Sequence, residues 1–362
     1  MAPILHMFIF LLASTELIVA RLAEDGLPTW VKNKELYLLR DQVEADVVVS
    51  TDGTGDYLKI MDAVENAPNN SDHRYIIYLK KGLYLENVLI SASKSNLMLL
   101  GDGMSNTIIS GNRSKDGVHW NCTFDTATFA VIGNGFIAKD LTFENTAGPQ
   151  MNQSVALLSD SDQSVFFRCG IMGYQDTLYA HYNLQFYREC RISGTVDFIF
   201  GDGTVVFQNC EIIARKGRPK QKNTITAHGC EKLNETTGFS FQFCNISADL
   251  DLIASDYSNP TYLGRPWQRY SRTIFMQSYM SSVISPEGWL EWEGQEDFNK
   301  TLFYAEYKNY GLGANLSLRV KWPGFHAIND DAQADIFTVS KFIDGNSWLP
   351  STGVNYTGGL TA

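Results

Sequence analysis

The chain has 362 residues, of which 44% are hydrophobic and 12% aromatic, so it is long and apolar enough to bury a large core as one domain. A formal charge of -11, without any stripe of Lys and Arg, argues against a nucleic-acid-binding protein. The densest basic run, residues 215–222, is interpreted as a solvated loop.

An apolar segment opens the chain. Residues 3–20 form the longest apolar stretch, and His6, Ser14 and Glu16 interrupt it. The stretch is too short and too interrupted to suit a membrane-spanning helix, which needs about 20 apolar residues. We therefore expect residues 1–23 to be a secretory signal peptide, with a buried N-terminal helix as the alternative. Residues 24–45 would then be a short segment without a core of its own.

Secretion agrees with the cysteine count and with the glycosylation motifs. Six cysteines are an even number, as in many secreted proteins, although free cysteines are also common in cores. Bridges such as Cys169 with Cys190, or Cys210 with Cys244, and a ladder of packed thiols are both compatible with the sequence. Asn-X-Ser/Thr motifs predict a glycoprotein. They lie at Asn69, Asn112, Asn121, Asn152, Asn234, Asn245, Asn299, Asn315 and Asn355.

From residue 46 onward the pattern changes to short strands separated by Gly, Asn and Asp. The strand segments read DVVVS, YIIYL, NLMLLG, TIISG, TFAVIG and DLTFEN. One helical spacing occurs, because Tyr57, Ile60, Met61 and Val64 would share a face. We expect this short helix to cover the first strands, whose edges would otherwise be unpaired.

A repeat follows in the middle of the chain. The segments VFFRCGI, QFYRECRI, VVFQNCEI and FSFQFCNI place Cys169, Cys190, Cys210 and Cys244 at equivalent positions. A short period rich in aromatic and β-branched residues indicates stacked coils of a parallel β-helix. The expected fold class is therefore all-β, with residues 46–362 as one domain. Its last part, from about residue 322, is predicted to be a tail packed along the solenoid.

Two carboxylates recur with the period of this repeat. Asp176 in QDTLY and Asp197 in DFIFG are 21 residues apart, and each follows a ladder cysteine by seven residues. Since neighbouring coils lie about 4.8 Å apart, the two side chains should stand side by side on one face.

Further polar residues lie in strand-like surroundings. Gln153 opens QSVALLSDSD, Gln175 precedes Asp176, and YLGRPW contains Arg265 and Trp267. Such groups are costly to bury without partners, so they need an explanation. Each one alone could be a stacked polar ladder or a turn cap, but together they indicate a site.

Several other kinds of site are not supported by the sequence. It has no G-x-S-x-G elbow, and its six histidines show no metal-ligand spacing. The Gly133-Asn134-Gly135 segment is followed by strand-like alternation, so a turn between coils is favoured over a dinucleotide fingerprint. We therefore expect neither a metal nor another cofactor.

Long ordered motifs make the chain from residue 46 to its C-terminus resemble plant-type pectin methylesterases. They include DGTGDYLKIMDAV, KKGLYLENV, TFAVIGNGFIAKDLTFENTAG, QSVAL, YQDTLY, GTVDFIFG, TYLGRPW and WLPSTG. The resemblance implies a right-handed parallel β-helix that hydrolyses methyl esters of galacturonosyl residues in pectin. It also implies secretion to the cell wall, a monomer and no cofactor. A proteinaceous pectinesterase inhibitor is an expected partner, whereas nucleic acid and, after signal removal, membranes are not.

The resemblance assigns a role to each candidate residue. Asp197 matches the family's nucleophile, and Asp176 matches its general acid, which later acts as base. Gln153 and Gln175 match the residues that stabilise the oxyanion. Arg265 matches the residue that holds the nucleophile, and Trp267 matches one that contacts the sugar. Thr123 matches a substrate-contacting threonine, and Tyr179 and Trp289 match aromatic positions along the groove.

The sequence also departs from the family pattern. In DFIFGDG an extra carboxylate, Asp202, replaces the commoner Asn after the glycine, so it could alter pH dependence or subsite preference, or point into solvent. Larger members carry an inhibitor-like pro-region, whereas only about twenty residues separate the expected signal from the solenoid. We thus expect a form made without that region.

Two other functions remain open. A pectin-cleaving glycosidase on the same fold would also use paired acids, but it would not need the two glutamines and the arginine. A noncatalytic wall-binding solenoid would tolerate loss of either aspartate. Release of methanol distinguishes an esterase from both.

Overall fold

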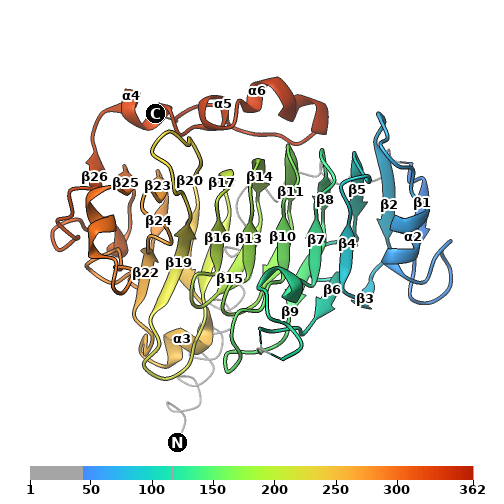
Figure 1. Ribbon diagram of the computed structural model, residues 1–362, viewed down its shortest axis with the longest axis horizontal. Coiled ribbons are helices and arrows are strands. Elements are labelled where there is room, and N and C mark those ends of the chain that lie inside the picture. Colours follow the sequence, from blue (N-terminus) through green and yellow to red (C-terminus); the bar gives the residue numbers. More distant parts are fainter. Residues whose placement is uncertain (1–43, 116–117, 362) are drawn as a thin grey trace, which may run out of the picture. The chain divides into compact units, whose positions relative to one another are not determined.

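The computed structural model describes residues 44–115 and 118–361, which form a right-handed parallel β-helix (Figure 1). This confirms the fold class predicted from the repeat. The expected signal peptide, residues 1–23, and nearly all of the segment 24–45 lie outside the described residues. In the part of the chain that is described, no helix is long and apolar enough to cross a bilayer.

Three parallel sheets run along the solenoid, and most coils add one strand to each. In the described chain the first sheet has eleven strands: β1 (Val47–Val49), β2 (Tyr75–Leu79), β5 (Leu97–Leu100), β8 (Ile137–Lys139), β11 (Ser164–Phe167), β14 (Leu184–Arg188), β17 (Thr204–Gln208), β20 (Gly238–Gln242), β23 (Arg272–Met276), β25 (Phe303–Tyr307) and β26 (Phe325–Ile328). The second, over the same residues, has eight: β3 (Gly82–Leu85), β6 (Thr107–Gly111), β9 (Thr142–Asn145), β12 (Gly170–Met172), β15 (Arg191–Gly194), β18 (Glu211–Ala214), β21 (Asn245–Ala248) and β24 (Tyr279–Met280). The third, again among described residues, has seven: β4 (Val88–Ile90), β7 (Phe129–Val131), β10 (Leu157–Ser159), β13 (Leu178–Ala180), β16 (Ile199–Gly201), β19 (Asn223–His228) and β22 (Thr261–Gly264).

The cysteine repeat corresponds to a sharp corner between the first and second sheets. One residue with left-handed φ precedes each ladder cysteine, and these residues are Arg168, Glu189, Asn209 and Phe243, with φ from 51° to 58°. Non-glycine residues seldom adopt this conformation, so its recurrence shows that the stacked coils impose it. The cysteine that follows points into the core, and at most 2% of it is exposed.

The ladder cysteines are free thiols that pack on one another's coils. Cys190 Sγ donates to the carbonyl of Phe166 at 3.2 Å, and Cys244 Sγ donates to that of Phe207 at 3.4 Å. All six cysteines are unbridged. Of the two arrangements that the sequence allowed, the structure has the packed ladder.

Aromatic side chains stack along the core for the same reason. In-register pairing places Phe166, Tyr187, Phe207, Phe241 and Phe275 at equivalent positions of successive coils. Their ring centroids are 4.4–4.9 Å apart in successive stacked pairs. Equivalent residues of neighbouring coils therefore contact each other, so the same aromatic packing repeats along the solenoid.

A helix covers the first coil, as predicted, but it begins later. α2 (Ile60–Asn66) buries Ile60 and Val64, whereas Tyr57 forms an isolated bridge with Val49. The helix starts there because the carboxylate of Glu86 accepts hydrogen bonds from the backbone N–H groups of Ile60 (2.9 Å) and Met61 (3.2 Å). A residue distant in sequence thus caps the helix, which the local pattern did not reveal.

The C-terminal tail lies along the outer face of the first sheet (Figure 1). Its helices α4 (Asp331–Asp335), α5 (Val339–Phe342) and α6 (Gly345–Trp348) are short, and Val339 and Trp348 pack on Val165 and Phe186. The final extended segment is held by side-chain amides of Gln208, Gln242 and Gln277, which donate to the carbonyls of residues 357, 359 and 361 at 2.7–2.9 Å. Strand β26 lies within the predicted tail and extends the first sheet, which the sequence did not indicate.

The remaining short helices lie in loops between the strands. They are α3 (Leu250–Ala254), η4 (Phe124–Thr126), η5 (Glu296–Lys300), η6 (Leu312–Ala314) and η7 (Leu349–Thr352). The glycosylation motifs also lie mostly on the surface, where their asparagines are exposed. Asn299 is the exception among them, because it is only 7% exposed and its side chain donates to Glu291. Asn299 is therefore not accessible to glycosylation in the folded protein.

The unbridged cysteines lead to a test by thiol titration. Only Cys122 is exposed, so we expect the native protein to react with a thiol reagent at one position and the denatured protein at six. Treatment with reductant before denaturation should leave the number unchanged. A count of four or fewer in denaturant without reductant would show that the ladder contains a disulfide.

Candidate active site

The two aspartates are brought together by the register of the third sheet. Leu178 of β13 pairs with Ile199 of β16, so Asp176 and Asp197, two residues earlier on each coil, occupy equivalent positions. Both residues have left-handed φ, 60° and 49°, and each is only 7% exposed. They lie in a cleft of about 550 Å³ on the outer face of this sheet. The structure thus places them as the spacing predicted.

Asp197 is held by an arginine and a threonine. Arg265 Nε donates to Oδ1 at 2.8 Å and Arg265 Nη2 donates to Oδ2 at 2.6 Å, which is a bidentate pair. Thr224 Oγ1 donates to Oδ1 at 2.6 Å and accepts from the backbone N–H of Asp197 at 2.8 Å. The guanidinium of Arg265 in turn lies 4.4 Å from the ring centre of Trp292. These contacts fix both the position and the rotation of the carboxylate.

Asp176 has different surroundings. Among the described residues, none donates a hydrogen bond to its carboxyl group. Burial raises the pKa of Asp176 well above its usual value, and the negative charge of Asp197 raises it further. The positive charges of Arg265 and Lys115 act in the opposite direction. Two equivalent positions on the coils therefore carry one carboxylate that is ion-paired and one carboxyl whose pKa is raised.

Two side-chain amides complete the polar part of the cleft. Gln153 and Gln175 both line it and are half-buried. Their backbone carbonyls accept from the N–H groups of Lys115 (2.9 Å) and Ser154 (3.1 Å). Their side-chain amides, by contrast, make no hydrogen bond to any described residue. These N–H groups are therefore free to donate to a ligand in the cleft.

An aromatic surface lies next to the carboxylates. Tyr179 stacks on Phe200 with centroids 4.3 Å apart, and Phe200 meets the edge of Trp267 at 6.1 Å. Trp267 approaches the backbone of Gly229 so closely that a Cβ there would lie 2.9 Å from its ring. The result is an aromatic platform, with ring faces of the kind that sugar rings contact.

The other two predicted substrate residues differ in their placement. Thr123 lines the cleft from the start of η4. Trp289, which we expected along the groove, is instead 1% exposed and belongs to the core. Its Nε1 donates to Glu306 at 3.2 Å and its ring stacks on Tyr304 at 4.1 Å. Trp289 does not line this cleft, but it lines the hollow that adjoins it, so its expected contact with the substrate stays a prediction.

Sequence reasoning missed several residues of the cleft. Trp292, Phe200 and Lys115 also line the cleft. The sequence could have indicated Phe200, because side chains alternate along the strand that follows Asp197 and Phe200 lies at an outward position of DFIFG. Thr224 had none, since a long loop separates it from Asp197 and hides the coil period.

Asp202 lies in a ladder with two other titratable residues. His181 Nδ1 is 3.6 Å from Asp160, and His181 Nε2 is 3.9 Å from Asp202. Burial raises the pKa of both aspartates. The extra carboxylate is thus directed at a partner on the neighbouring coil rather than simply into solvent.

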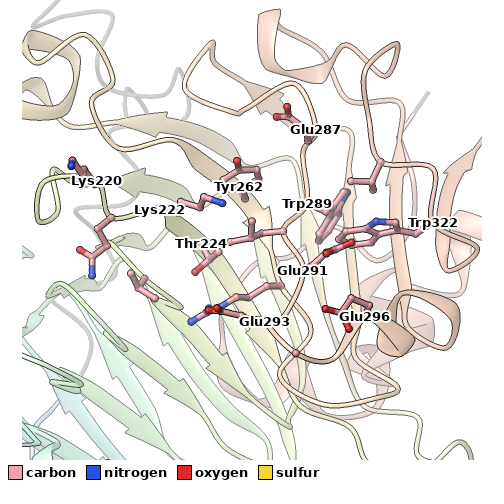
Figure 2. Close-up of a pocket in the computed structure, with 16 residues that line it drawn as sticks. Lys220, Lys222, Thr224, Tyr262, Glu287, Trp289, Glu291, Glu293, Glu296 and Trp322 are labelled. Atoms are coloured by element: carbon pink, nitrogen blue, oxygen red, sulfur yellow. The ribbon is translucent and has the colours of Figure 1, made fainter.

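A second, larger hollow adjoins the cleft at Arg265 and is shown in Figure 2. Its volume is about 800 Å³. Lys220 and Lys222 lie on one side, Glu291 and Glu296 lie on the other, and Glu287 and Glu293 also line the hollow. Within the described part of the chain, no group of three or more His, Cys, Asp and Glu side chains is placed to hold a metal ion.

Known proteins are similar to this chain over most of its length. The pectinesterase family model matches residues 46–346. A pectinesterase/pectinesterase inhibitor of Prunus persica is 62% identical over 334 residues, which are 91% of this chain but only 63% of that protein. The structure of a pectin methylesterase from carrot is 47% identical with a TM-score of 0.86, and the match covers 88% of this chain and 99% of that one. The structure of a pectin methylesterase in complex with a hexasaccharide is 26% identical with a TM-score of 0.69, covering 88% of this chain and 100% of that one.

The raised pKa of Asp176 leads to a stability prediction. Because the folded protein binds this proton more tightly than the unfolded chain, Asp176 ionises first in the unfolded chain, and the fold loses stability as pH rises above the ordinary value of 3.8. We expect Asp176→Asn to raise Tm by a few degrees at neutral pH and to leave Tm unchanged near pH 3.

Thermal unfolding at several pH values checks this prediction. Asp72→Asn, at an exposed aspartate, is the control and should change Tm at neither pH. A fall in Tm for Asp176→Asn at neutral pH would show that the buried carboxyl stabilises the fold.

Proposed function

The chain belongs to the pectinesterase family, and on that premise we propose that it hydrolyses the methyl esters of galacturonosyl residues in pectin, giving pectate and methanol. The observation that carries the proposal is the pair of aspartates, one ion-paired and one with a raised pKa, in a single cleft. Ester hydrolysis through a carboxylate needs one ionised and one protonated acid at the same pH.

In the proposed reaction Asp197 is the nucleophile. Its Oδ1 accepts two of the hydrogen bonds described above, whereas its Oδ2 accepts one. A lone pair of Oδ2 therefore remains for attack on the ester carbonyl carbon. Arg265 pairs with this carboxylate and orients it, and Trp292 supports the guanidinium from its face.

The side-chain amides of Gln153 and Gln175 stabilise the oxyanion that forms. Both N–H groups lack protein partners among the described residues, so no existing hydrogen bond must break when negative charge develops on the substrate oxygen. Loss of one such donor typically costs about 3–4 kcal/mol in the transition state.

Asp176 then completes both halves of the reaction. Its proton passes to the departing methoxide, which leaves as methanol while Asp197 forms an anhydride with the galacturonate. The resulting carboxylate of Asp176 removes a proton from water, and the hydroxide attacks the acyl carbon. Galacturonate leaves with its free carboxylate, Asp197 is restored, and Asp176 holds the proton again.

The aromatic platform binds the sugar rings in this proposal. Trp267 and Tyr179 offer flat faces beside the aspartates, and Thr123 offers a hydroxyl from its loop.

We also propose that residues 46–362 act as one catalytic domain, that residues 1–23 direct secretion to the cell wall, and that the protein works as a monomer. A proteinaceous inhibitor would bind over the cleft. The solved relative with a bound hexasaccharide supports a sugar polymer as ligand.

The first test is methanol release from highly methylated pectin without added metal. Asp197→Ala removes the nucleophile, so we expect kcat to fall at least about a thousandfold. Asp202→Asn, at the other end of the same strand, is the matched control and should keep most of the activity. Turnover by Asp197→Ala at the parent rate would refute the mechanism, and binding of pectin without turnover by the parent would indicate a binding module.

The second test concerns pH. The charge of Lys115 lowers the pKa of Asp176, so Lys115→Gln should raise that pKa further. Because the acid form of Asp176 is required, the alkaline limb of kcat/KM should move to higher pH. Lys216→Gln, at an exposed lysine outside the cleft, should leave the limb in place. A shift of the limb to lower pH would contradict the role of Asp176 as general acid.

A further inference from the structure

Two exposed tyrosines lie side by side on the outer face of the second sheet. Tyr279 of β24 and Tyr310 of the next coil form an isolated parallel bridge, and their side chains are 37% and 60% exposed. Their ring centres are 5.7 Å apart. Neither residue lines the cleft or the hollow beside it, so the proposed reaction does not explain this aromatic pair.

The ring of Tyr279 is held against the backbone of the next coil. Gly311 has a φ of 96°, and a Cβ built on it would lie 2.8 Å from the ring of Tyr279. The ring therefore occupies the space that a side chain at residue 311 would need. Because the ring is already ordered, a group that covers it immobilises little further side-chain freedom.

The register of the second sheet places a glycosylation motif in the same row. Asn245 of β21, in the motif NIS, pairs directly with Tyr279, which in turn pairs with Tyr310. These three residues thus occupy equivalent outward positions of successive coils. Since neighbouring strands lie about 4.8 Å apart, the row is only about 10 Å long.

The side chain of Asn245 is available for modification. Asn245 is exposed, and its amide makes no hydrogen bond to any described residue. Other motif asparagines already use their side chains, because Asn152 donates to the carbonyl of Lys115 at 3.1 Å and Asn315 accepts from the backbone N–H of Ser317 at 2.9 Å. Among these three asparagines, only Asn245 combines a free amide with an aromatic neighbour on the adjoining strand.

The two sides of Asn245 differ in chemistry. On the coil before it lies Glu211, which is paired with Arg191 at 3.8 Å. On the coil after it lie the two tyrosines. A pyranose ring presents C–H groups on its faces, and these pack favourably on aromatic rings. A sugar attached to Asn245 is therefore drawn towards the tyrosines rather than towards the ion pair.

We propose that Asn245 carries an N-linked glycan whose first sugars lie across Tyr279 and Tyr310. In the attachment step, Asn245 Nδ2 loses a proton and forms a bond to C1 of N-acetylglucosamine, while the lipid diphosphate of the oligosaccharide donor leaves. Ser247 completes the motif that this transfer requires. The inference requires the proposed secretion but not the proposed reaction.

The glycan would stabilise one end of the second sheet. β24 is the last strand of that sheet and has only two residues, so few ladder hydrogen bonds hold it. Sugars that span from β21 across Tyr279 to Tyr310 connect three coils at this edge. They also remove the exposed tyrosine faces from water.

Peptide mass spectrometry tests the attachment. The full chain is secreted from a plant or yeast cell, and enzymatic release of the glycan converts each modified asparagine to aspartate. We expect this conversion at residue 245 in most molecules. Glycans at other motifs with Asn245 unmodified would overturn this inference alone, whereas absence of glycans from every motif would contradict the proposed secretion as well.

Thermal unfolding of four secreted proteins tests the contact with the tyrosines. Ser247→Ala removes the motif but keeps Asn245, and we expect it to lower Tm by about 2 °C or more. Tyr279→Ser should lower Tm in the glycosylated protein and clearly less in the Ser247→Ala background. Tyr279→Phe keeps the ring and should retain the effect of the glycan. Equal effects of Tyr279→Ser in both backgrounds would overturn the proposal.

The matched control removes a glycosylation motif elsewhere. Thr236→Ala abolishes the motif at Asn234, which lies in an exposed loop, and should leave Tm unchanged. Two results would assign the tyrosines to another occupant and overturn the proposal. One is a Tm of the parent that rises with protein concentration, which indicates a second copy of the chain. The other is an unchanged Tm for Ser247→Ala together with binding of a neutral glucan that Tyr279→Ser abolishes.

Discussion

Parallel, in-register pairing between neighbouring coils is the constraint on which the site depends. It places residue 176 beside residue 197, and it stacks the corner residues, the ladder cysteines and the core aromatics in the same way. A carboxylate pair at this separation would be unfavourable on a flexible loop, because like charges and burial both oppose it. Here the ladder hydrogen bonds of the third sheet fix the backbone on either side. The sheet can therefore hold two acids together that would otherwise move apart.

The difference between the two acids comes from their partners rather than from their positions on the coil. Arg265 and Thr224 satisfy Asp197, whereas Asp176 receives no hydrogen bond from any described residue. Arg265 is itself supported by the ring of Trp292. Behind β22, which precedes Arg265, Trp289 stacks on Tyr304 in the core and donates through Nε1 to Glu306, which is paired with Arg319. The support of the catalytic geometry thus extends well into the C-terminal half of the solenoid.

Positive and negative charges both lie beside the cleft of this acidic chain. The chain is acidic overall, so in the proposed function a polyanionic wall would retain it less than a basic protein. The lysines beside the cleft are a local exception, and they face glutamates across the second hollow (Figure 2). In the proposed function, this combination suits an enzyme that makes its substrate more anionic with every turnover.

The sequence by itself determined the β-helix and the pairing of Asp176 with Asp197, because both follow from a repeat whose period is preserved between residues 169 and 210. It also indicated the covering helix and the tail, because the spacing of apolar residues shows which face of a segment is buried. Only the tertiary structure decided the contacts that residues in loops and on distant coils make, because the repeat does not extend to them. Thr224 follows a long loop, Glu86 caps α2 from a distant coil, and Trp289 and Trp292 are three residues apart with opposite placements. Sequence spacing predicts contacts along a regular strand stack, whereas contacts between loops depend on paths that no local pattern specifies.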